Sequence, residues 1–301
     1  MYECKNILLK PIFLNFSLTL NSLKVFGITR SGKEILNKLI GQFAFVIADY
    51  NKNYYFMARD RIGLKPLYYS IGNQYFAFSS EFNTLNTSNL VSFSPNREAY
   101  VSYLRHLAIP NGSTGNENIQ KVQPGEFIEV DFEGKIKKEL YWDPFDFATD
   151  QDITRSEAVD RLDELLKSSV DYRKISDVEV GLYLSGGLDS TLIGSLLASD
   201  TKIKSFNVDY DEIFDGYKGE YKEAKFSADQ INVDLIHKSI SFEEFKSIIS
   251  DYPFLQDDLI GDEVGIPLYF LGKLTKFNGL KVVQVGEGAD ELFYGYEHWL
   301  R

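Results

Sequence analysis

The sequence has a single cysteine, Cys4, among its 301 residues. One cysteine can form neither an internal disulfide nor a cysteine-based metal cluster, and this scarcity is typical of a reducing compartment, so we expect a cytoplasmic protein. Basic residues are also few, since 32 Lys and Arg stand against 44 Asp and Glu, for a formal net charge of -12. Such a charge argues against nucleic acid or an anionic membrane as the main partner.

Long apolar runs are missing as well. The apolar stretch over residues 7–20 is interrupted by Lys10, Pro11 and Asn15, is too short to span a bilayer, and lacks a cleavage site. The hydrophobic content of 44% and the charged content of 25% are ordinary for a soluble globular protein. A chain of this length has room for two domains, each with its own core.

Paired apolar runs rich in aromatic residues occupy the first half of the sequence and are typical of β-hairpins. One helix is expected among them, over residues 96–109, with an apolar stripe made of Tyr100, Tyr103, Leu104 and Leu107. We expect a β-rich domain with short helices over residues 1–145. Its predicted strands are residues 42–50, 54–60, 67–71, 74–79, 126–132 and 135–141.

No residues in this half pair a nucleophile with a base. His106 lies within the expected helix and is interpreted as a packed or solvated histidine. Arg59 and Asp60 stand at a turn, and we interpret them as a structural ion pair that holds the turn rather than as catalytic groups.

Residues 146–153 are polar and form the expected linker. A capping-box pattern, Thr154 with Glu157, then predicts the start of a helix, and strands alternate with helices through the rest of a second domain over residues 154–301. This alternation indicates an α/β fold with a parallel sheet covered by helices on both faces. In such folds ligands bind at the carboxyl ends of the strands. The predicted strands here are residues 178–184, 203–208, 233–240 and 281–285.

Residues 184–190, LSGGLDS, follow the first of these strands and enter a helix. Two glycines let the backbone turn sharply with its N–H groups uncovered, and the helix N-terminus adds further donors, so the layout suits a phosphate. Asp189 would repel phosphates unless a cation intervenes, which points to Mg²⁺. The alternative is a plain glycine turn after a buried strand, and the loop alone leaves both interpretations open. It is not a Walker A sequence, because no Gly-Lys-Ser/Thr closes it.

A second loop, residues 286–291 with the sequence GEGADE, again joins an apolar strand to a helix. Asp290 can face Asp189 across the same crevice, and two carboxylates suit Mg²⁺ together with phosphate oxygens and water. The alternative role for Asp290 and Glu291 is to complement the helix dipole. Beside a phosphate-type loop on a neighbouring strand, the metal interpretation is favoured.

Taken together, the two loops resemble a known family. Residues 185–190 resemble the PP-loop of the N-type ATP pyrophosphatases, and residues 286–296 resemble the second signature of glutamine-dependent asparagine synthetases. Residues 41–45, 59–69, 79–81, 124–125 and 141–142 resemble the later part of that family's glutaminase domain and its exit. The resemblance implies a partial N-terminal-nucleophile glutaminase domain, followed by a PP-loop ATP pyrophosphatase domain like the adenine nucleotide alpha hydrolases.

The resemblance also implies a reaction: ATP adenylylates the β-carboxylate of aspartate, pyrophosphate leaves, and ammonia attacks the aspartyl-AMP. ATP and Mg²⁺ are the expected cofactors. Glu287 is expected to face the reacting centre, and Asp189 and Asp290 to hold Mg²⁺. Asp262 falls where the family also has an aspartate. The residues expected to bind pyrophosphate, or to border the base and ribose, are Leu184, Ser185, Gly186, Gly187, Asp189, Ser190, Val208 and Gly286.

Some positions depart from the family. Its glutaminases begin Met-Cys-Gly, whereas Tyr2 stands at the second position here, and the stretches that bind glutamine are missing. Cys4 is a poor substitute, so no glutaminase nucleophile is expected and the glutaminase half is expected to be inactive. The family also continues into a long helical region with a further catalytic lysine, so we interpret the chain as incomplete at both ends. Smaller departures are Asp209 and Tyr294, where glycine is common, and Val285, where serine is common.

Three functions remain open. The first is an asparagine synthetase-type ligase that uses aspartate and ammonia, or glutamine through a partner or a missing segment. The second is a relative that forms an amide on another carboxylate, of a surface sugar or a β-lactam precursor. The third is an inactive ATP-binding fragment, or a subunit that needs a partner. The expected partners include no nucleic acid and no membrane, and a homodimer is left open.

Overall fold

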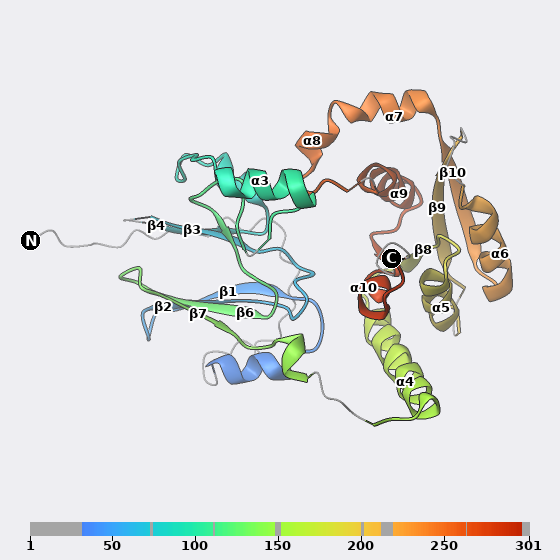
Figure 1. The fold of residues 1–301 in the computed structure, drawn as a ribbon, viewed down its shortest axis with the longest axis horizontal. Helices are drawn as coiled ribbons and strands as arrows, with labels where there is room; N and C mark the ends of the chain where they lie inside the picture. The colour runs from blue at the N-terminus through green and yellow to red at the C-terminus, as the bar shows by residue number, and fades with distance from the viewer. Residues whose placement is uncertain are drawn as a thin grey trace, which may run out of the picture. The chain divides into compact units, whose positions relative to one another are not determined.

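The computed structural model describes residues 32–72, 75–110, 112–147, 152–199, 202–211, 219–262 and 264–296 (Figure 1). The chain divides into two compact units. The first comprises Met1–Asp150 with Phe254–Gly261, and the second comprises Gln151–Pro253 with Asp262–Arg301. Tyr2 and Cys4, and half of the expected linker, lie outside the described residues.

Two antiparallel sheets form the first unit, as the hairpin pattern predicts. One has the order β1-β2-β6-β7 and the other the order β4-β3-β5. Short helices accompany them. The strands are β1 (Ala44–Asp49), β2 (Tyr54–Arg59), β3 (Tyr68–Gly72), β4 (Tyr75–Ser79), β5 (Gln120–Lys121), β6 (Glu126–Asp131) and β7 (Ile136–Leu140). The helices are η1 (Gly32–Lys38), α2 (Phe82–Asn86), α3 (Arg97–His106) and η2 (Pro144–Phe147).

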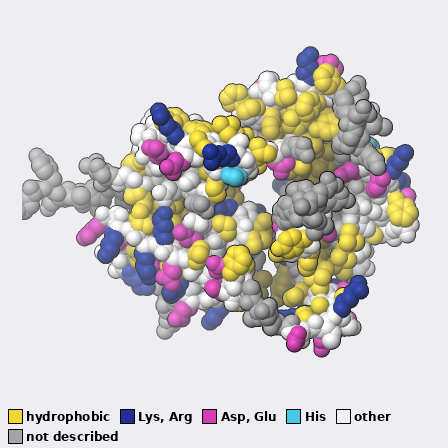
Figure 2. Space-filling model, viewed as in Figure 1, with side chains coloured by type: hydrophobic (Ala, Val, Ile, Leu, Met, Phe, Trp, Pro, Cys, Tyr) yellow, Lys and Arg dark blue, Asp and Glu magenta, His cyan; other side chains and the backbone are white. Residues whose placement is uncertain are grey.

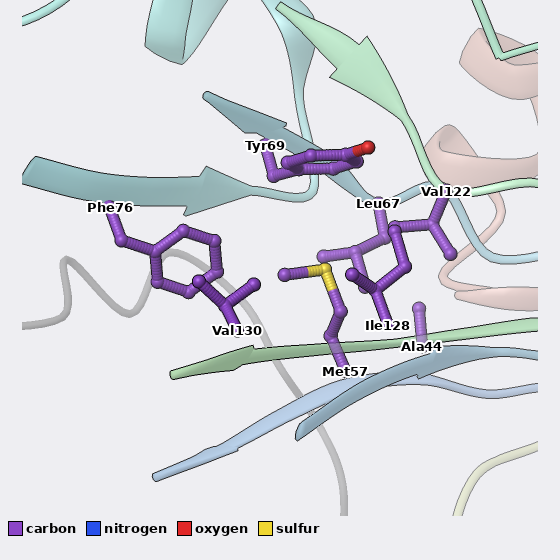
Figure 3. Packing of buried hydrophobic residues seen from close by; sticks show 8 residues of the cluster. All are labelled: Ala44, Met57, Leu67, Tyr69, Phe76, Val122, Ile128 and Val130. Carbon is purple, nitrogen blue, oxygen red and sulfur yellow. The ribbon is translucent and has the colours of Figure 1, made fainter. Parts of the chain in front are cut away.

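The inner strands of the larger sheet, β2 and β6, are largely buried on both faces, whereas the edge strand β7 is mostly exposed. Side chains alternate along a strand, so Met57 of β2 faces the smaller sheet while Phe56 faces the opposite side, where η1 packs. This explains why β2 reads as a continuous apolar run. The core between the two sheets consists of Ala44, Met57, Leu67, Tyr69, Phe76, Val122, Ile128 and Val130 (Figure 3).

The helix expected over residues 96–109 is present as α3 but is shorter. It ends at His106, because Leu107 adopts a left-handed conformation with φ 59°. The predicted apolar stripe is wrong in part, since Leu104 is 79% exposed and Leu107 is exposed too, while Ala99 is the buried residue. Periodicity identified the helix, but the packing neighbours decide which side of it is covered.

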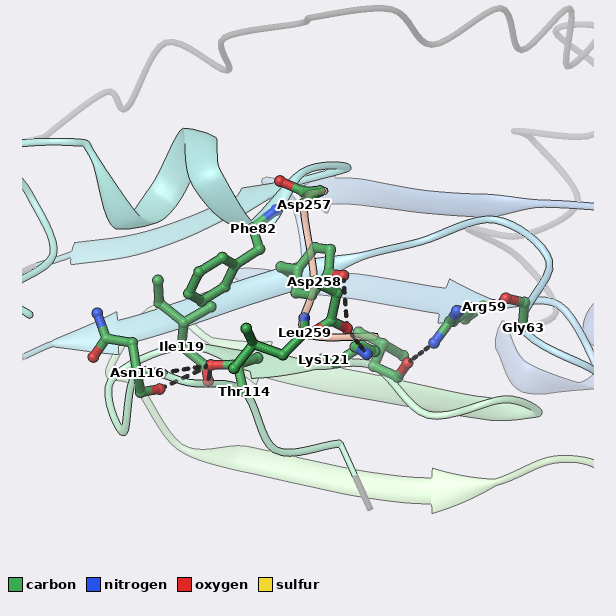
Figure 4. A network of polar contacts seen from close by, with 12 residues as sticks. Arg59, Gly63, Phe82, Thr114, Asn116, Ile119, Lys121, Asp257, Asp258 and Leu259 are labelled. Carbon is green, nitrogen blue, oxygen red and sulfur yellow. Dashed lines mark hydrogen bonds and ion pairs between the residues drawn. The ribbon is translucent and has the colours of Figure 1, made fainter. Parts of the chain in front are cut away.

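A segment from the second half of the sequence completes the first unit (Figure 4). The carboxylate of Asp257 accepts the backbone N–H groups of Phe82 and Asn83, at 2.5 and 2.8 Å, and thereby caps α2, whose own N-cap residue makes no side-chain cap bond. Asp258 forms an ion pair with Lys121 and accepts a hydrogen bond from the hydroxyl of Tyr68 at 3.3 Å. Burial, followed by the charges of Asp258 and Asp257, raises the pKa of Tyr68.

The second unit is a parallel sheet with the order β10-β9-β8-β11. Apolar clusters lie on both of its faces, one with α5 and α6 and the other with α7 and α9, which confirms the predicted α/β class. The strands are β8 (Val180–Tyr183), β9 (Lys204–Tyr210), β10 (Asp234–Ile240) and β11 (Val282–Gln284). The helices are α4 (Arg155–Lys174), α5 (Leu188–Leu197), α6 (Tyr221–Ile231), α7 (Phe242–Ile249), α8 (Tyr252–Leu255), α9 (Gly265–Phe277) and α10 (Ala289–Phe293).

Helix starts in this unit follow the sequence pattern closely. Thr154 and Glu157 form a complete capping box at α4, and Ser241 and Glu244 form one at α7. Apolar side chains nevertheless remain at the surface of these helices, as Figure 2 shows over α7, and Leu165 of α4 is among the exposed ones. No helix among the described residues is long and apolar enough to cross a membrane.

Arg59 and Asp60 hold the turn after β2, but not mainly by pairing with each other. The Asp60 side chain, on a residue only 1% exposed, accepts the backbone N–H groups of Phe43, Leu64 and Lys65 at 2.9–3.2 Å. Arg59 donates to three backbone carbonyls, including that of Val122 at 2.8 Å. The expected structural role is therefore met through hydrogen bonds to the backbone.

We expect Asp60→Asn to destabilise the first unit by about 2 kcal/mol, because the amide offers only one accepting oxygen and at least one buried N–H group loses its partner. Urea unfolding, followed by the fluorescence of the core tyrosines, measures the change. Asp146→Asn, at an exposed position of η2, is the control and should change the stability by less than about 0.5 kcal/mol. Equal stabilities of the two variants would contradict this account of the turn.

Candidate functional site

The first predicted loop begins where the β8–β9 ladder ends. Leu184 is 1% exposed, and its N–H donates to the carbonyl of Phe206 at 3.0 Å, which anchors the start of the loop to β9. Gly187 is the N-cap of α5 and provides no side-chain cap. The first N–H groups of α5 therefore have no capping side chain, and this leaves donors and the positive end of the helix dipole for an anion.

Hydrogen bonds among its own small residues shape this loop. The hydroxyls of Ser185 and Ser190 share a hydrogen bond of 3.0 Å, and the N–H of Gly187 donates to the Ser185 hydroxyl at 3.2 Å. Ser190 is buried, whereas Ser185 and Asp189 are half-buried. The two predicted hydroxyl donors therefore lie on opposite sides of one turn and brace it.

Gly186 is a glycine for a structural reason. Its φ is +89°, in the region that L side chains rarely adopt, and a Cβ atom there would collide with the backbone of Glu223 and Ala224. These two residues belong to the first turns of α6. The loop is therefore packed between the N-terminal ends of α5 and α6.

The second predicted loop lies directly against the first. A Cβ atom on Gly286 would stand 2.9 Å from the backbone nitrogen of Ser190 and 3.2 Å from the Cβ of Asp189. Because β11 pairs with β8, the two loops leave neighbouring strands at the same edge of the sheet. The structure thus brings together two loops that lie about a hundred residues apart in the sequence.

Carboxylates crowd the second loop. Desolvation raises the pKa of Glu287, and the negative charges of Glu291, Asp262 and Asp290 raise it further. Asp262, whose role the sequence leaves open, is therefore close enough to act on Glu287. Glu291 behaves differently, because it accepts a hydrogen bond from the hydroxyl of Tyr296 at 2.7 Å, and this bond lowers its pKa.

The described residues hold no group of three or more His, Cys, Asp or Glu side chains arranged to bind a metal ion. The expected Mg²⁺ site needs only Asp189 and Asp290, with phosphate oxygens and water completing it. Asp189 is in the first turn of α5 and Asp290 is in the first turn of α10, with Gly286 touching the former. Carboxylate oxygens are ligands that suit a hard divalent cation, and the cation would reduce the repulsion among the carboxylates of this region.

The structure changes the interpretation of two positions, Val208 and Tyr294. The side chain of Val208 packs in an apolar cluster with Ile240, Ile248 and Phe270, so only its backbone is left to border a nucleotide. Tyr294, where the family commonly has glycine, has a φ of 56°, which is the left-handed region that favours glycine. Thus the glycine of the family suits this position better than tyrosine does.

Sequence reasoning missed a polar layer behind the first loop. Asn207 and Asp209 are buried on β9, and His237 stands beside Asn207 on β10. The alternation of polar residues along β9 was the available signal. A groove of about 620 Å³ at the amino-terminal ends of β9 and β10, lined in part by Lys204 and Asp234, contains none of the predicted site residues.

The opposite pKa shifts of Glu287 and Glu291 predict opposite effects of pH. The raised pKa of Glu287 means that its ionised form is disfavoured by the fold, so the native protein should lose stability relative to Glu287→Gln as the pH rises from about 4 to 7. The lowered pKa of Glu291 means that Glu291→Gln should be less stable than the native protein near neutral pH. That difference should vanish as the pH falls through the lowered pKa.

Thermal melting of the three proteins across this pH range measures both effects. Each variant serves as the control for the other, because Glu287 lies in the loop that leads into α10 and Glu291 lies in the first turn of the same helix. Parallel pH profiles for the two variants would contradict the assigned electrostatics.

Both halves of the chain match known sequence families. The asparagine synthase model matches residues 161–301, and the glutamine amidotransferase domain model matches residues 23–142. The chain is 34% identical over 265 residues to asparagine synthetase [glutamine-hydrolyzing] 1 of Bacillus subtilis, covering 88% of this chain and 41% of that protein. A putative asparagine synthetase of Methanocaldococcus jannaschii is 29% identical, with 88% and 51% covered.

The chain is also similar to proteins that are not named asparagine synthetases. Amidase chry2 of Gibberella zeae is 29% identical over 285 residues, covering 88% of this chain and 41% of the amidase. Among solved structures, an ammonia-dependent NAD synthetase of Campylobacter jejuni is 19% identical over 48% of this chain and 61% of its own, with a TM-score of 0.30. A score this low carries no argument about function.

The chain spans about half, or less, of the length of the curated relatives it matches. The match nevertheless includes both halves in the same order, the amidotransferase domain first and the synthase domain second. On these grounds, and with its two loops meeting at the sheet edge, the chain belongs to the asparagine synthetase family.

Proposed function

We propose that this chain carries the nucleotide-binding and amide-forming part of an asparagine synthetase. A carboxylate oxygen of aspartate attacks the α-phosphorus of ATP, and the bond to the bridging oxygen breaks, so that pyrophosphate leaves with the electron pair. Ammonia then attacks the acyl carbon, AMP leaves, and the nitrogen loses a proton. The observation that carries this proposal is the packing of Gly286 against Asp189 and Ser190, which joins both loops into one site.

The phosphate groups would be held mainly by backbone donors. Ser185, Gly186 and Gly187 present N–H or hydroxyl groups at the start of α5, where the helix dipole favours negative charge. Such preorganised donors stabilise the charge that grows on pyrophosphate as it leaves. Leu184, Val208 and Gly286 would border the base and ribose through their backbone.

Asp189 and Asp290 would hold Mg²⁺, which would offset the charge of the polyphosphate. Glu287 is the proposed catalytic carboxylate beside the reacting carbon. Its raised pKa makes it a better proton acceptor than an ordinary glutamate, which suits removal of a proton from the attacking nitrogen.

Two features bear on the alternatives. A relative at a similar level of identity is named an amidase. A carboxylate other than that of aspartate is therefore the alternative acceptor. The amidotransferase-like unit is proposed not to hydrolyse glutamine, since the stretches that bind glutamine in the family are missing from this sequence. An inactive ATP-binding chain is the third possibility, and one assay separates the three.

We expect aspartate-dependent exchange of labelled pyrophosphate into ATP by the purified chain, because adenylylation precedes and does not require ammonia. Asp189→Asn should lower this exchange by about a hundredfold or more, because the growing charge on pyrophosphate loses its stabilisation. Asp160→Asn, on the exposed side of α4, is the matched control and should leave the exchange unchanged.

The exchange assay also tests the acceptor, and asparagine formation tests the ammonia source. If exchange occurs only with another carboxylic acid, that acid and not aspartate is the acceptor. If the chain binds nucleotide but catalyses no exchange, it is an inactive ATP-binding chain. Asparagine formation with ammonium but not with glutamine supports the assignment of the amidotransferase-like unit. Glutamine-dependent formation would refute that assignment.

The loop geometry predicts a selective effect of one methyl group. Gly186→Ala places a side chain at a positive φ and against the backbone of α6, so the loop must shift, and we expect the affinity for Mg·ATP to fall about tenfold or more. Gly272→Ala in α9 is the control, because no heavy atom lies within 4 Å of the added Cβ. The control should bind normally and melt at the same temperature or higher. Equal binding by both variants, measured by calorimetry, would rule out this loop as the phosphate site.

A further inference from the structure

The central strand of the second unit carries polar side chains on one buried face. Ser205, Asn207 and Asp209 alternate along β9 and are 0%, 4% and 8% exposed. Since alternate residues share a face, Phe206 and Val208 point the other way, and Val208 joins an apolar cluster there. Polar groups buried in a central strand must find hydrogen-bond partners within the protein. The hydrogen-bond partners of these side chains therefore indicate which parts of the unit this face of β9 holds in place.

Asn207 bridges three adjacent strands. Its amide nitrogen donates to the carbonyl of Leu184 at 3.0 Å, and its amide oxygen lies 2.9 Å from Nδ1 of His237, its cross-strand neighbour on β10. Leu184 is the residue directly before Ser185. The Asn207 side chain therefore holds the carbonyl of the residue that directly follows β8, at the point where the phosphate loop begins.

The hydrogen-bond pattern defines the state of His237. The carbonyl of Leu184 can only accept, so the amide nitrogen of Asn207 faces it and the amide oxygen faces His237. His237 must then carry a proton on Nδ1. Burial lowers the pKa of His237, against the opposing charge of Asp209, so the ring is neutral near pH 7 with its proton on Nδ1.

His237 also connects this bridge to the other wall of the loop. Its ring packs against that of Tyr221, with centroids 4.1 Å apart. Tyr221 opens α6, and its N–H donates to the carboxylate of Asp209 at 3.3 Å. Gly186 packs against the same part of α6, at Glu223 and Ala224. One connected set of side chains on β9 and β10 thus contacts both the entry to the loop and the helix that encloses it.

We propose that Asn207, oriented by His237, is a positioning residue for the phosphate loop. It fixes the carbonyl of Leu184 and, through His237 and Tyr221, the first turn of α6, so that the loop N–H groups are aimed at phosphate before the nucleotide binds. The proposal rests on the proposed binding of ATP at this loop. It assigns the ordering of the loop to Asn207 and His237, which lie outside the loop sequence on β9 and β10.

The test compares Asn207→Leu with Ser205→Ala. Both substitutions remove a side-chain donor to a backbone carbonyl on the same face of β9, but Ser205 donates to Asp234, at the other end of the strand pair, at 3.0 Å. Hydrogen exchange of the peptide covering residues 184–190 reads the order of the loop without nucleotide. Calorimetry reads the affinity for Mg·ATP, and thermal melting reports the general loss of stability.

We expect Asn207→Leu to speed exchange of the loop amides and to weaken Mg·ATP binding about tenfold, whereas Ser205→Ala changes neither beyond about twofold. If Asn207→Leu does not fold, His237→Phe replaces it. That variant keeps an aromatic ring beside Tyr221 but loses the Nδ1 donor, and it should produce the same faster exchange with a smaller loss of affinity.

The outcomes separate the two proposals. If the native chain binds no Mg·ATP, the proposed function fails, while the exchange measurement still decides whether Asn207 orders the loop. If the Asn207 or His237 variant and Ser205→Ala show equal loop exchange, the positioning role is refuted even when ATP binds.

Discussion

Close contact between glycine loops is the constraint on which the second unit depends. Gly286 lies against Asp189 and Ser190, and Gly186 lies against the first turns of α6, so neither position has room for a side chain. The strand order β10-β9-β8-β11 creates the first of these contacts by placing β11 beside β8. The candidate binding site at this edge therefore depends on topology as much as on the loop sequences.

Electrostatics at this edge are unusual for a site that would bind a polyanion. The chain is acidic overall, and desolvation together with the negative charges of Glu291, Asp262 and Asp290 raises the pKa of Glu287. The positive potential must therefore come from backbone N–H groups and from the dipole of α5. A divalent cation that arrives with the nucleotide would reduce the remaining repulsion, and Asp189 and Asp290 are its proposed ligands.

The first unit depends on a different long-range arrangement. Two sheets enclose one core, but the start of α2 and the ammonium group of Lys121 are satisfied by Asp257 and Asp258, which come from the second half of the sequence. A helix start and a partly buried charge without partners would cost free energy. Phe254–Gly261 is therefore an integral part of the unit against which it packs.

Local patterns in the sequence predicted every described strand except β5, as well as most helix starts and the two glycine loops. Capping boxes at Thr154 and Ser241 and the alternating apolar runs depend on neighbours a few residues away, so they could be predicted. Tertiary structure alone decided which face of α3 is buried, that Asp257 caps α2, and that Asn207 joins His237 to the entry of the loop. These features depend on strand order and on packing between distant segments, and a hydrogen bond or a buried face exists only when both partners have been brought together.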